Sequence, residues 1–583
     1  MKLLTLLLLC ITLQHTLYCQ YYLRGIVQDE KGKPLFGAKI YLQTKGQLLF
    51  NSGDDGSFGL PTPKAIDTIT VLMQGYEPCK MGVNTQQFQT ITLKMMNNSS
   101  QMMLNRLNSL TTNLGLHKDL VTLTDMGDSY NNLIENDFVN AATHPETGFA
   151  INTDRASYSN IRRFVANQMK PPTSSVRIEQ MLNYFNLHPS NSINTSETKF
   201  SFHPAVSSCP WNKNNNLVYI NLQAPKLNLK NIPPCNLVFL IDVSGSMDQP
   251  NRLPLLQSAF KMLVDNLRDV DRIAIVTYGG GVNVVLNPTS GGEKKKILDV
   301  INGLNADGDT PGSGAIRTAY YLAKEIFKKE ANNRVIIATD GDFNVGQHSD
   351  QELEDIIVSQ KQTGIFLTCL GVGMGNFKDS KLQTLAKFGN GNYAYLDNIV
   401  EAEKVLVTEF TQTLFNVAED AYLKINFNPK LVHKYRLIGF DNTIEAVSTP
   451  TNQLEGGEVG SGHNLMAIFE VEPNNNLTNS TNLAQLHLQY IVPKTKQKII
   501  DSFAIANEFK DIMAVDSVYR FATAVTMYGS LMIGSKYERN FSFDDVMNLA
   551  KTAADARILA QKEFLQLIDK AIEVYYPGKK KRK

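Results

Sequence analysis

The sequence predicts a multidomain protein whose central part, residues 234–416, is a doubly wound α/β domain with a mostly parallel sheet. Three observations lead to this prediction. Apolar runs of strand length, such as Leu237–Ile241, alternate with segments in which apolar residues recur at helical spacing. Residues 22–96 contain only short β-type runs between turn signals. Residues 417–576 return to alternating strands and close with helices, which predicts a mixed β and α region.

Length and composition are those of a globular protein. A chain of 583 residues is too long for one hydrophobic core, and 43% hydrophobic and 19% charged residues are typical of folded domains. The formal net charge of +1 creates no overall field that would attract nucleic acid. Residues 577–583 contain a basic run that we interpret as a solvated tail.

The amino terminus predicts export. A basic start and the apolar run Leu3–Leu13 are typical of a secretory signal, because a spanning helix needs about 20 residues. We assign residues 1–19 to this signal. A lipid anchor at Cys19 is the alternative, although Tyr18 stands where a bacterial lipid-attachment motif has a small residue. No other run is long and apolar enough to span a membrane, so we expect the protein in the periplasm, at the outer membrane or on the cell surface.

Residues 22–96 contain a sequence pattern with glycines at fixed positions. Gly25–Ala38 has the pattern Gly-x-Val-x-Asp-x-x-Gly-x-Pro-Leu-x-Gly-Ala, and Asp-Gly-x-Phe at Asp55–Phe58 and Gly75-Tyr76 follow. We expect these glycines at turns that require positive φ. The pattern resembles that of carboxypeptidase regulatory-like domains, which implies a β-sandwich that serves as a non-catalytic spacer or binding unit.

Two segments separate this domain from the central one. Residues 97–128 are rich in Asn, Ser, Thr and Met and are predicted to be a linker. Residues 129–233 form an amino-terminal extension of the central domain, with predicted helices at Ser157–Met169 and Ser174–Phe185. We expect their charged residues to form ion pairs with neighbouring segments; a functional charged surface is the alternative. These residues are Arg162, Arg163, Arg177 and Glu179.

Polar residues after the strand Leu237–Ile241 indicate a metal site. Asp242, Ser244 and Ser246 stand at alternate positions of the loop that leaves the strand. One carboxylate and two hydroxyls can converge on a single point, and such hard oxygen ligands suit Mg²⁺, Mn²⁺ or Ca²⁺. Open α/β sheets bind ligands at the carboxyl ends of their strands. The simpler interpretation is that these side chains cap the next helix.

The motif Asp-x-Ser-x-Ser resembles the metal-ion-dependent adhesion site of von Willebrand factor type A domains, which have a Rossmann-like fold. The resemblance implies that a Thr and an Asp from two later loops complete the metal shell, and that Mg²⁺ is the first ion to expect. Thr310 and Asp340, which follows the predicted strand Arg334–Thr339, stand at the matching positions. The implied ligands are Asp242, Ser244, Ser246, Thr310 and Asp340. Gly245 and Gly341 are expected to let the loops approach the ion, and Asp248 and Asp342 to lie in an outer shell.

The spacing of apolar residues also predicts the other helices and strands of the central domain. After the metal loop we expect alternating helices and strands, with a hairpin partner for the second strand. The expected helices are 255–267, 295–301, 313–328 and 351–360, and the expected strands are 273–278, 282–286, 365–372 and 393–396.

The carboxy-terminal region has characteristic segments without an evident chemistry. Tyr435–Phe440 and Gly456–His463, together with Phe149–Tyr158, resemble a bacterial group of secreted type A domain proteins, whose carboxy-terminal domain has no assigned role. We expect helices at Asp516–Tyr528 and, as one long helix with an apolar stripe, at Ser542–Glu573.

Other motifs and groups of polar residues in the sequence do not indicate an enzyme. The loop Gly371–Gly375 lacks the last glycine of a nucleotide-binding fingerprint, and Asn305–Asp309 begins like a calcium loop but has no glutamate at the required position. His463 and Glu458 have no nucleophile motif beside them. One disulfide is compatible with export, but the spacing of the cysteines assigns no pair.

The sequence therefore predicts a non-catalytic protein-interaction or adhesion module. The resemblance implies that an Asp or Glu carboxylate of a partner protein completes the metal shell. One alternative is a structural envelope protein in which the metal only stabilises the loops, and another is a metal-dependent hydrolase. An open metal face would favour partner binding, whereas a face covered by residues 97–233 would favour a structural or autoinhibited role. A deep pocket that brings His463 to the metal would favour an enzyme.

Overall fold

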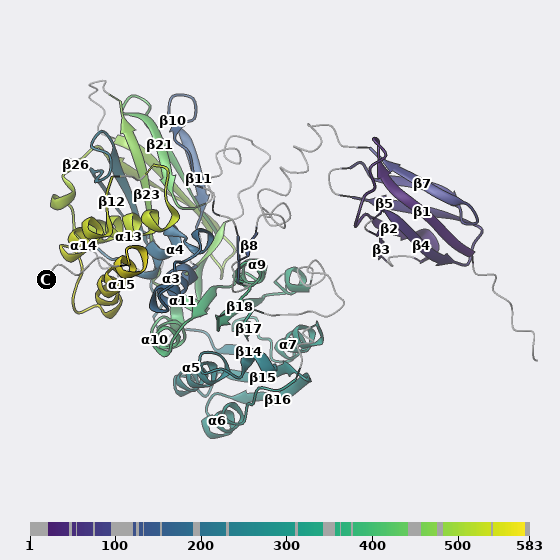
Figure 1. The fold of residues 1–583 in the computed structure, drawn as a ribbon. Helices are drawn as coiled ribbons and strands as arrows, with labels where there is room; N and C mark the ends of the chain where they lie inside the picture. Colours follow the sequence, from purple (N-terminus) through teal and green to yellow (C-terminus); the bar gives the residue numbers. More distant parts are fainter. Residues whose placement is uncertain are drawn as a thin grey trace, which may run out of the picture. The chain divides into compact units, whose positions relative to one another are not determined.

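The computed structural model describes most of the chain in two compact units, Met1–Ser109 and Leu110–Lys583 (Figure 1). The predicted signal, most of the predicted linker and the end of the basic tail lie outside the described residues. No helix of the described residues is long and apolar enough to cross a membrane. The described residues are 21–45, 49–53, 55–73, 76–94, 121–123, 128–131, 133, 135–151, 154–189, 199–228, 232–308, 313–341, 356–361, 363–374, 377–440, 456–474, 482–537 and 540–577.

The first unit consists of two sheets around one core. One sheet has the order β4-β1-β7 and the other β3-β2-β5-β6. Alternate residues of the strands are buried, and Leu23, Ile40 and Val71 from both sheets meet in a single apolar cluster. The strands are β1 Tyr21–Asp29, β2 Lys39–Leu42, β3 Leu49–Asn51, β4 Ser57–Thr62, β5 Ile66–Leu72, β6 Cys79–Asn84 and β7 Phe88–Leu93.

The glycines of this unit have two different roles. Gly32, Gly37 and Gly56 have φ of +77°, +74° and +75°, as the sequence predicted for turns. Gly25 differs from the prediction because it lies inside β1, where a Cβ atom would contact Gln89 O and lie 2.6 Å from the ring of Phe58. It permits a close approach between strands rather than a turn. Gly75 lies outside the described residues.

A six-stranded sheet with the order β16-β15-β14-β17-β18-β19 forms the centre of the second unit. All neighbouring strands are parallel except β16, which is the predicted hairpin partner of β15. The strands are β14 Cys235–Asp242, β15 Arg272–Gly279, β16 Gly281–Ser290, β17 Asn332–Thr339, β18 Ile365–Val372 and β19 Tyr393–Leu396.

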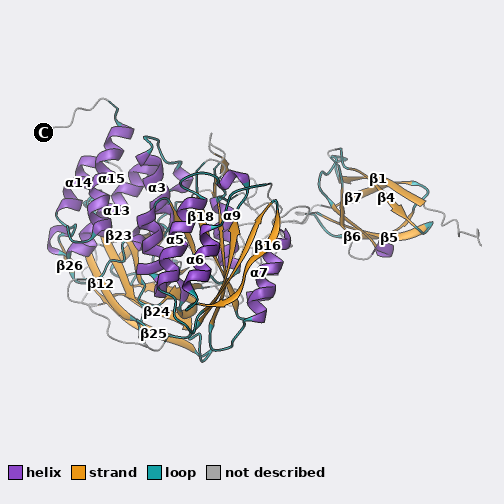
Figure 2. Ribbon diagram, turned by 90° about the horizontal axis from the view of Figure 1, so that it is seen from below, coloured by secondary structure: helices purple, strands orange, loops and turns teal. Residues whose placement is uncertain are grey.

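Helices cover both faces of this sheet, as the sequence predicted (Figure 2). Successive residues of β14 alternate between the two faces: Phe239 packs in the cluster that contains α5 and α6, and Leu240 in the cluster that contains α7 and α9. Part of the predicted helix 351–360 lies outside the described residues. The helices are α5 Leu253–Asp265, α6 Lys294–Asn302, α7 Ser313–Glu325, α9 Asp379–Phe388 and α10 Ile399–Glu403.

Segments from both sides of the central domain share two further sheets. One has the order β10-β21-β23-β13-β12-β26, and the other has β11-β20-β24-β25 with β22 paired to β20. The sequence analysis assigned no strands to β12 and β13. The strands are β10 Val139–Asn140, β11 Glu146–Ala150, β12 Ser201–Ser208, β13 Asn216–Gln223, β20 Asn416–Phe427, β21 Val432–Ile438, β22 Gly457–Gly460, β23 Asn464–Pro473, β24 Asn482–Ile491, β25 Lys498–Ala506 and β26 Phe509–Lys510.

The two sheets enclose one apolar cluster, and helices pack on the outer face of the sheet that contains β13 and β23 (Figure 2). The helices are α3 Ala156–Ala166, α4 Ile178–Tyr184, α13 Ser517–Ile533, α14 Phe543–Lys551 and α15 Leu559–Tyr575. The prediction of one long final helix is wrong. Asp555 accepts hydrogen bonds from the backbone and side chain of Arg557 between α14 and α15, and the break lets Tyr575 pack 5.3 Å from the Phe543 ring.

Two of the four charged residues of the extension, Arg162 and Arg163, form ion pairs, as expected. Arg162 contacts Asp397 at 2.5 Å and Glu401 at 2.7 Å. Arg163 is buried, contacts Asp128 at 2.8 Å and donates to Gly373 O at 3.0 Å. Both arginines therefore join α3 to the central domain.

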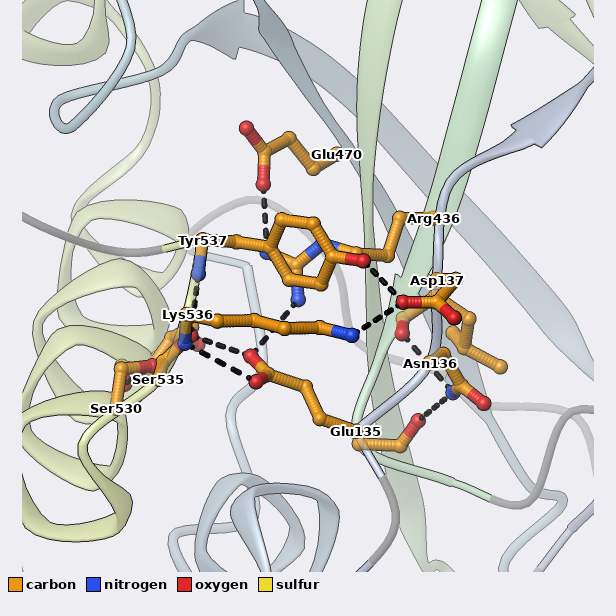
Figure 3. A network of polar contacts seen from close by, with 12 residues as sticks. Glu135, Asn136, Asp137, Arg436, Glu470, Ser530, Ser535, Lys536 and Tyr537 are labelled. Atoms are coloured by element: carbon orange, nitrogen blue, oxygen red, sulfur yellow. Dashed lines mark hydrogen bonds and ion pairs between the residues drawn. The ribbon is translucent and has the colours of Figure 1, made fainter.

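A polar network joins the segment before β10 to β21 and to the turn after α13 (Figure 3). Arg436 contacts Glu470 at 2.6 Å, with both side chains at most 2% exposed. The guanidinium lies 4.5 Å from the ring centre of Tyr537. Lys536 and Asp137 form a second pair at 2.5 Å, but these side chains are 51% and 72% exposed.

These two pairs should differ strongly in their effect on stability. The substitution Arg436→Met leaves the buried carboxylate of Glu470 without its cation and should lower the free energy of unfolding by roughly 3–5 kcal/mol. Lys536→Met removes a solvent-screened charge and should cause a much smaller loss. Urea unfolding of both variants measures the difference. Equal losses would show that Arg436 and Glu470 are not a buried pair in solution.

Glu458 in β22 has a side-chain carboxyl group whose pKa is raised. Its Oε2 accepts a hydrogen bond of 3.0 Å from Asn416 Nδ2. Burial, together with the negative charge of Glu419, raises its pKa from about 4.5 to about 8. Because the folded protein keeps this group protonated, the resulting stabilisation is fully present below about pH 4.5 and is lost as the pH rises through about 8.

Glu458→Gln should therefore become more stable relative to the wild type as the pH is raised from 5 to 9, because glutamine does not ionise. Urea unfolding midpoints at pH 5, 7 and 9 measure this trend. Glu403→Gln, at an exposed position of α10, is the control and should show no such trend. A pH-independent difference between wild type and Glu458→Gln would contradict the raised pKa.

Candidate metal centre

The register of the central sheet determines where the predicted ligands lie. Ile241 of β14 is paired with Ala338 of β17, and Asp242 with Tyr278 of β15. Since these strands are parallel, the residues that follow them emerge at one edge of the sheet. The structure brings together Asp242, Ser244, Ser246 and Asp340, whereas Thr310 and Asp342 lie outside the described residues.

Hydrogen bonds connect the four described side chains. The backbone N–H of Ser244 donates to Asp242 Oδ1 at 2.9 Å, and the hydroxyl oxygens of Ser244 and Ser246 lie 3.2 Å apart. The hydroxyl of Ser246 donates to Asp340 Oδ2 at 2.8 Å. Oxygen atoms from two loops therefore converge on one small region.

Two residues that the sequence analysis missed orient Asp242. Thr339 Oγ1 donates to Asp242 Oδ2 at 2.8 Å, and the Tyr278 hydroxyl donates to the same atom at 3.1 Å. Burial raises the pKa of Asp242, while the hydrogen bonds from Ser244 and Thr339 oppose the rise. Their positions in the sequence could have identified them, because both residues stand at or beside the ends of strands that neighbour β14.

Arg252, immediately before α5, was also missed. Its Nη1 contacts Asp340 Oδ2 at 2.7 Å and Ser246 O at 2.5 Å, and its Nη2 donates to Met374 O at 2.8 Å. Nothing in the spacing of the sequence places this arginine beside Asp340. A cation of the chain itself is therefore part of the centre.

Glycines allow the loops around the centre to approach one another. A Cβ atom at Gly279 would lie 2.9 Å from Ser244 N. At Gly245, whose N–H donates to Gly308 O at 2.9 Å, a Cβ atom would lie at an ordinary 3.7 Å from that oxygen, so the expected role of Gly245 is not required. Gly341 has φ of +96°, and a Cβ atom there would contact the backbone of Lys378. Gly341 thus admits the loop after β18 to the site.

The end of β14 and the loop after it, residues 242–248, have a buried side and an exposed side. Asp242 is fully buried, and Ser244 is 3% exposed. Gly245, Ser246 and Asp248 are exposed. The loop therefore presents part of its donor set to solvent.

The donor set fits a hard divalent cation. The described part comprises two carboxylates and two hydroxyls, and such oxygen ligands suit Mg²⁺, Mn²⁺ or Ca²⁺. Among the described residues no three His, Cys, Asp or Glu side chains gather in a group that could hold a metal, so the hydroxyls are needed to complete this set.

The acid–base pair that the sequence analysis set aside does not form. Both ring nitrogens of His463 are buried without a hydrogen-bond partner, so no hydrogen bond joins it to Glu458. Burial lowers the pKa of His463, and electrostatic interactions with Arg155, Lys404 and His188 reinforce this shift. The four cysteines described, Cys79, Cys209, Cys235 and Cys369, are free thiols.

Three protein-family models match parts of the chain. The model described as von Willebrand factor matches residues 124–219, and von Willebrand factor type A domain matches residues 237–342. The model for the carboxy-terminal domain of the uncharacterized protein YfbK matches residues 412–574. The match to the type A domain model contains all five predicted metal ligands.

Individual proteins are also similar. Uncharacterized protein YfbK of Escherichia coli (strain K12) is 34% identical over 466 residues, which cover 76% of this chain and 80% of the relative. Inter-alpha-trypsin inhibitor heavy chain H2 of Mus musculus is 28% identical over 163 residues, 27% of this chain and 17% of that protein. The structure of a von Willebrand factor type A protein from Catenulispora acidiphila is 14% identical, covers 65% of this chain and 90% of its own, and has a TM-score of 0.40.

The identity and coverage of the first relative, together with the matched models, decide the family. The chain belongs to the family of Escherichia coli YfbK, with a von Willebrand factor type A domain at its centre and a YfbK-type carboxy-terminal domain.

Proposed function

We propose that this chain is a non-catalytic, exported protein-interaction module that binds an acidic group of a partner protein through a divalent metal. Asp242, Ser244, Ser246 and Asp340 would hold the ion, and Thr310 would complete the set. Mg²⁺ is the proposed ion, with Mn²⁺ and Ca²⁺ as alternatives. When bound, the ion supplies an open coordination position that attracts a carboxylate.

One observation carries this proposal: the donor set is anchored in the core and ends at an exposed residue. Asp242 is fully buried and held by Thr339, Tyr278 and Ser244. Ser246, only four residues later, is exposed while its hydroxyl contacts Asp340. The buried side chains thus fix the donor geometry, and the exposed Ser246 places one end of the donor set at the surface.

The proposal also includes the chemistry of the partner, export of the chain and a role for residues 22–96. An Asp or Glu side chain of the partner suits the site because a carboxylate is a strong ligand for hard cations. Export rests on residues 1–19, and a carboxypeptidase regulatory-like spacer or binding role rests on the glycine pattern of residues 22–96, whose two sheets share one core. The net charge of +1 does not favour nucleic acid as the partner.

A structural role for the metal is the second candidate, and one observation favours it. Asp340 already has Arg252 as a cation and Ser246 as a donor, so the loops are joined within the chain. In that case an ion would add stability without recruiting a partner.

Metal binding should depend on the predicted ligands. Titration calorimetry with Mg²⁺ or Mn²⁺ should detect one site in the wild type, and thermal melting should show stabilisation of about 2.7 kcal/mol at a hundredfold excess of metal over Kd. Asp242→Ala should abolish binding, and Ser246→Ala should weaken it about tenfold or more. Ser258→Ala, at an exposed position of α5, is the control. Binding that survives Asp242→Ala would disprove the proposed site.

Partner capture should require both metal and Ser246. The mature protein is incubated with an envelope extract in Mg²⁺ and in EDTA, and the Ser246→Ala variant is tested in Mg²⁺. A partner retained only by the wild type in Mg²⁺, and lost when an exposed Asp or Glu of that partner is replaced by Ala, would support the metal bridge. If wild type with metal, wild type with EDTA and the variant all capture the same proteins, the structural role is favoured.

A further inference from the structure

Arg252 reaches from the start of α5 to the candidate metal centre. Its side chain is 13% exposed and that of Asp340 is 5% exposed, so their 2.7 Å contact is partly shielded from solvent. Nη1 also donates to Ser246 O at 2.5 Å. One guanidinium nitrogen therefore contacts two of the proposed metal-binding residues.

The arginine and the serine use the same acceptor atom. Asp340 Oδ2 accepts from Ser246 Oγ at 2.8 Å and from Arg252 Nη1 at 2.7 Å. An ion bound to Asp340 at Oδ2 would need an electron pair of this atom that now accepts one of these hydrogen bonds. It would also bring two more positive charges close to the guanidinium.

Glycine at position 373 leaves room for the side chain of Arg252. Gly373 has φ of +82°, and a Cβ atom there would lie 2.6 Å from Nε and 3.0 Å from Cγ of Arg252. Arg163 donates to Gly373 O at 3.0 Å from the extension, and Arg252 donates to the next carbonyl, Met374 O, at 2.8 Å. The loop after β18 thus holds Arg252 by a contact that does not involve Asp340.

We propose that Arg252 is a tethered cation that neutralises Asp340 in the absence of metal and competes with the divalent ion for it. Metal binding then displaces Nη1 from Asp340, while the contact with Met374 keeps the side chain near the site. Arg252 therefore lowers the metal affinity of the centre and sets the metal concentration at which it loads. This inference rests on the proposed function, because it requires that the centre binds metal.

The planar shape of the guanidinium explains why arginine serves here. Its separate nitrogens reach Asp340 and Met374 at the same time. A lysine has a single ammonium group and cannot bridge two such acceptors in the same fixed geometry. Lysine at this position should therefore compete less effectively than arginine, although its charge is the same.

Titration calorimetry of the full chain with MgCl₂ and with MnCl₂ tests the competition. Arg252→Gln should tighten Kd about tenfold or more, because a positive charge beside the ion is removed. Arg252→Lys should tighten Kd by a smaller factor. Lys261→Gln is the matched control: it removes one positive charge from α5 about 13 Å further along the helix and should change Kd less than about twofold.

Thermal melting supplies a second readout. In EDTA, Arg252→Gln should melt below the wild type, because Asp340 has lost its cation. The increase in Tm on adding Mg²⁺ should be larger in the variant than in the wild type. If Arg252→Gln does not fold, the same comparison is made with Arg252→Lys, for which an unchanged Kd overturns the proposal.

The outcomes separate this inference from the proposed function. If the wild type binds metal and Arg252→Gln binds it equally or more weakly, the competition is disproved and the proposed metal site stands. If neither protein binds metal while both are folded, both proposals fail. Tighter binding by Arg252→Gln but not by Lys261→Gln supports a competing arginine.

Discussion

The buried carboxylate of Asp242 imposes the strictest constraint on the central domain. It stands at the end of the middle strand, where it is fully removed from solvent. Such a group is costly to bury unless its oxygens accept hydrogen bonds. Thr339, Tyr278 and the backbone of Ser244 supply these bonds from two neighbouring strands and the following loop. The register of β15, β14 and β17 and the position of the loop after β14 therefore depend on one another.

The type A domain lies in the chain between strands of another body. β13 precedes it and β20 follows it, and these strands belong to the two sheets that enclose a separate apolar cluster. Arg162 and Arg163 of α3 join the helices outside those sheets to the central domain. The loop after β18 accepts a hydrogen bond from Arg163 at Gly373 and one from Arg252 at Met374. The extension is thus linked to the candidate metal centre through two successive carbonyl groups.

The family relationship explains the architecture better than it explains the chemistry. YfbK is itself described as uncharacterized, so the function has to be argued from the site. The site offers oxygen donors, a buried anchor and an exposed edge, which are suited to holding an ion in contact with another molecule. His463, which would be the natural base of an enzyme, is instead buried with the positively charged Arg155 and Lys404 as electrostatic neighbours. Under the proposals above, the arginine beside Asp340 would adjust the metal concentration at which the ion is held.

The sequence by itself determined the features that depend on local pattern. Apolar runs and helical spacing predicted the order of the central strands and helices, and the polar residues after Leu237–Ile241 and Arg334–Thr339 predicted an edge with Asp242 and Asp340, because strand ends in a parallel sheet share one side. The matching position of Thr310 remains a prediction. Local pattern also failed in places: a continuous apolar stripe suggested one final helix, although Asp555 and Arg557 form a turn within it.

Only the tertiary structure decided the contacts between residues far apart in the chain. The pairing of β13 with β23 and the contact of Arg163 with Gly373 join segments whose separation leaves no periodic signal. The contact of Arg252 with Asp340, 88 residues away, belongs to the same class. Such contacts depend on how packed elements aim their side chains, and many positions of a charged residue satisfy the same local pattern.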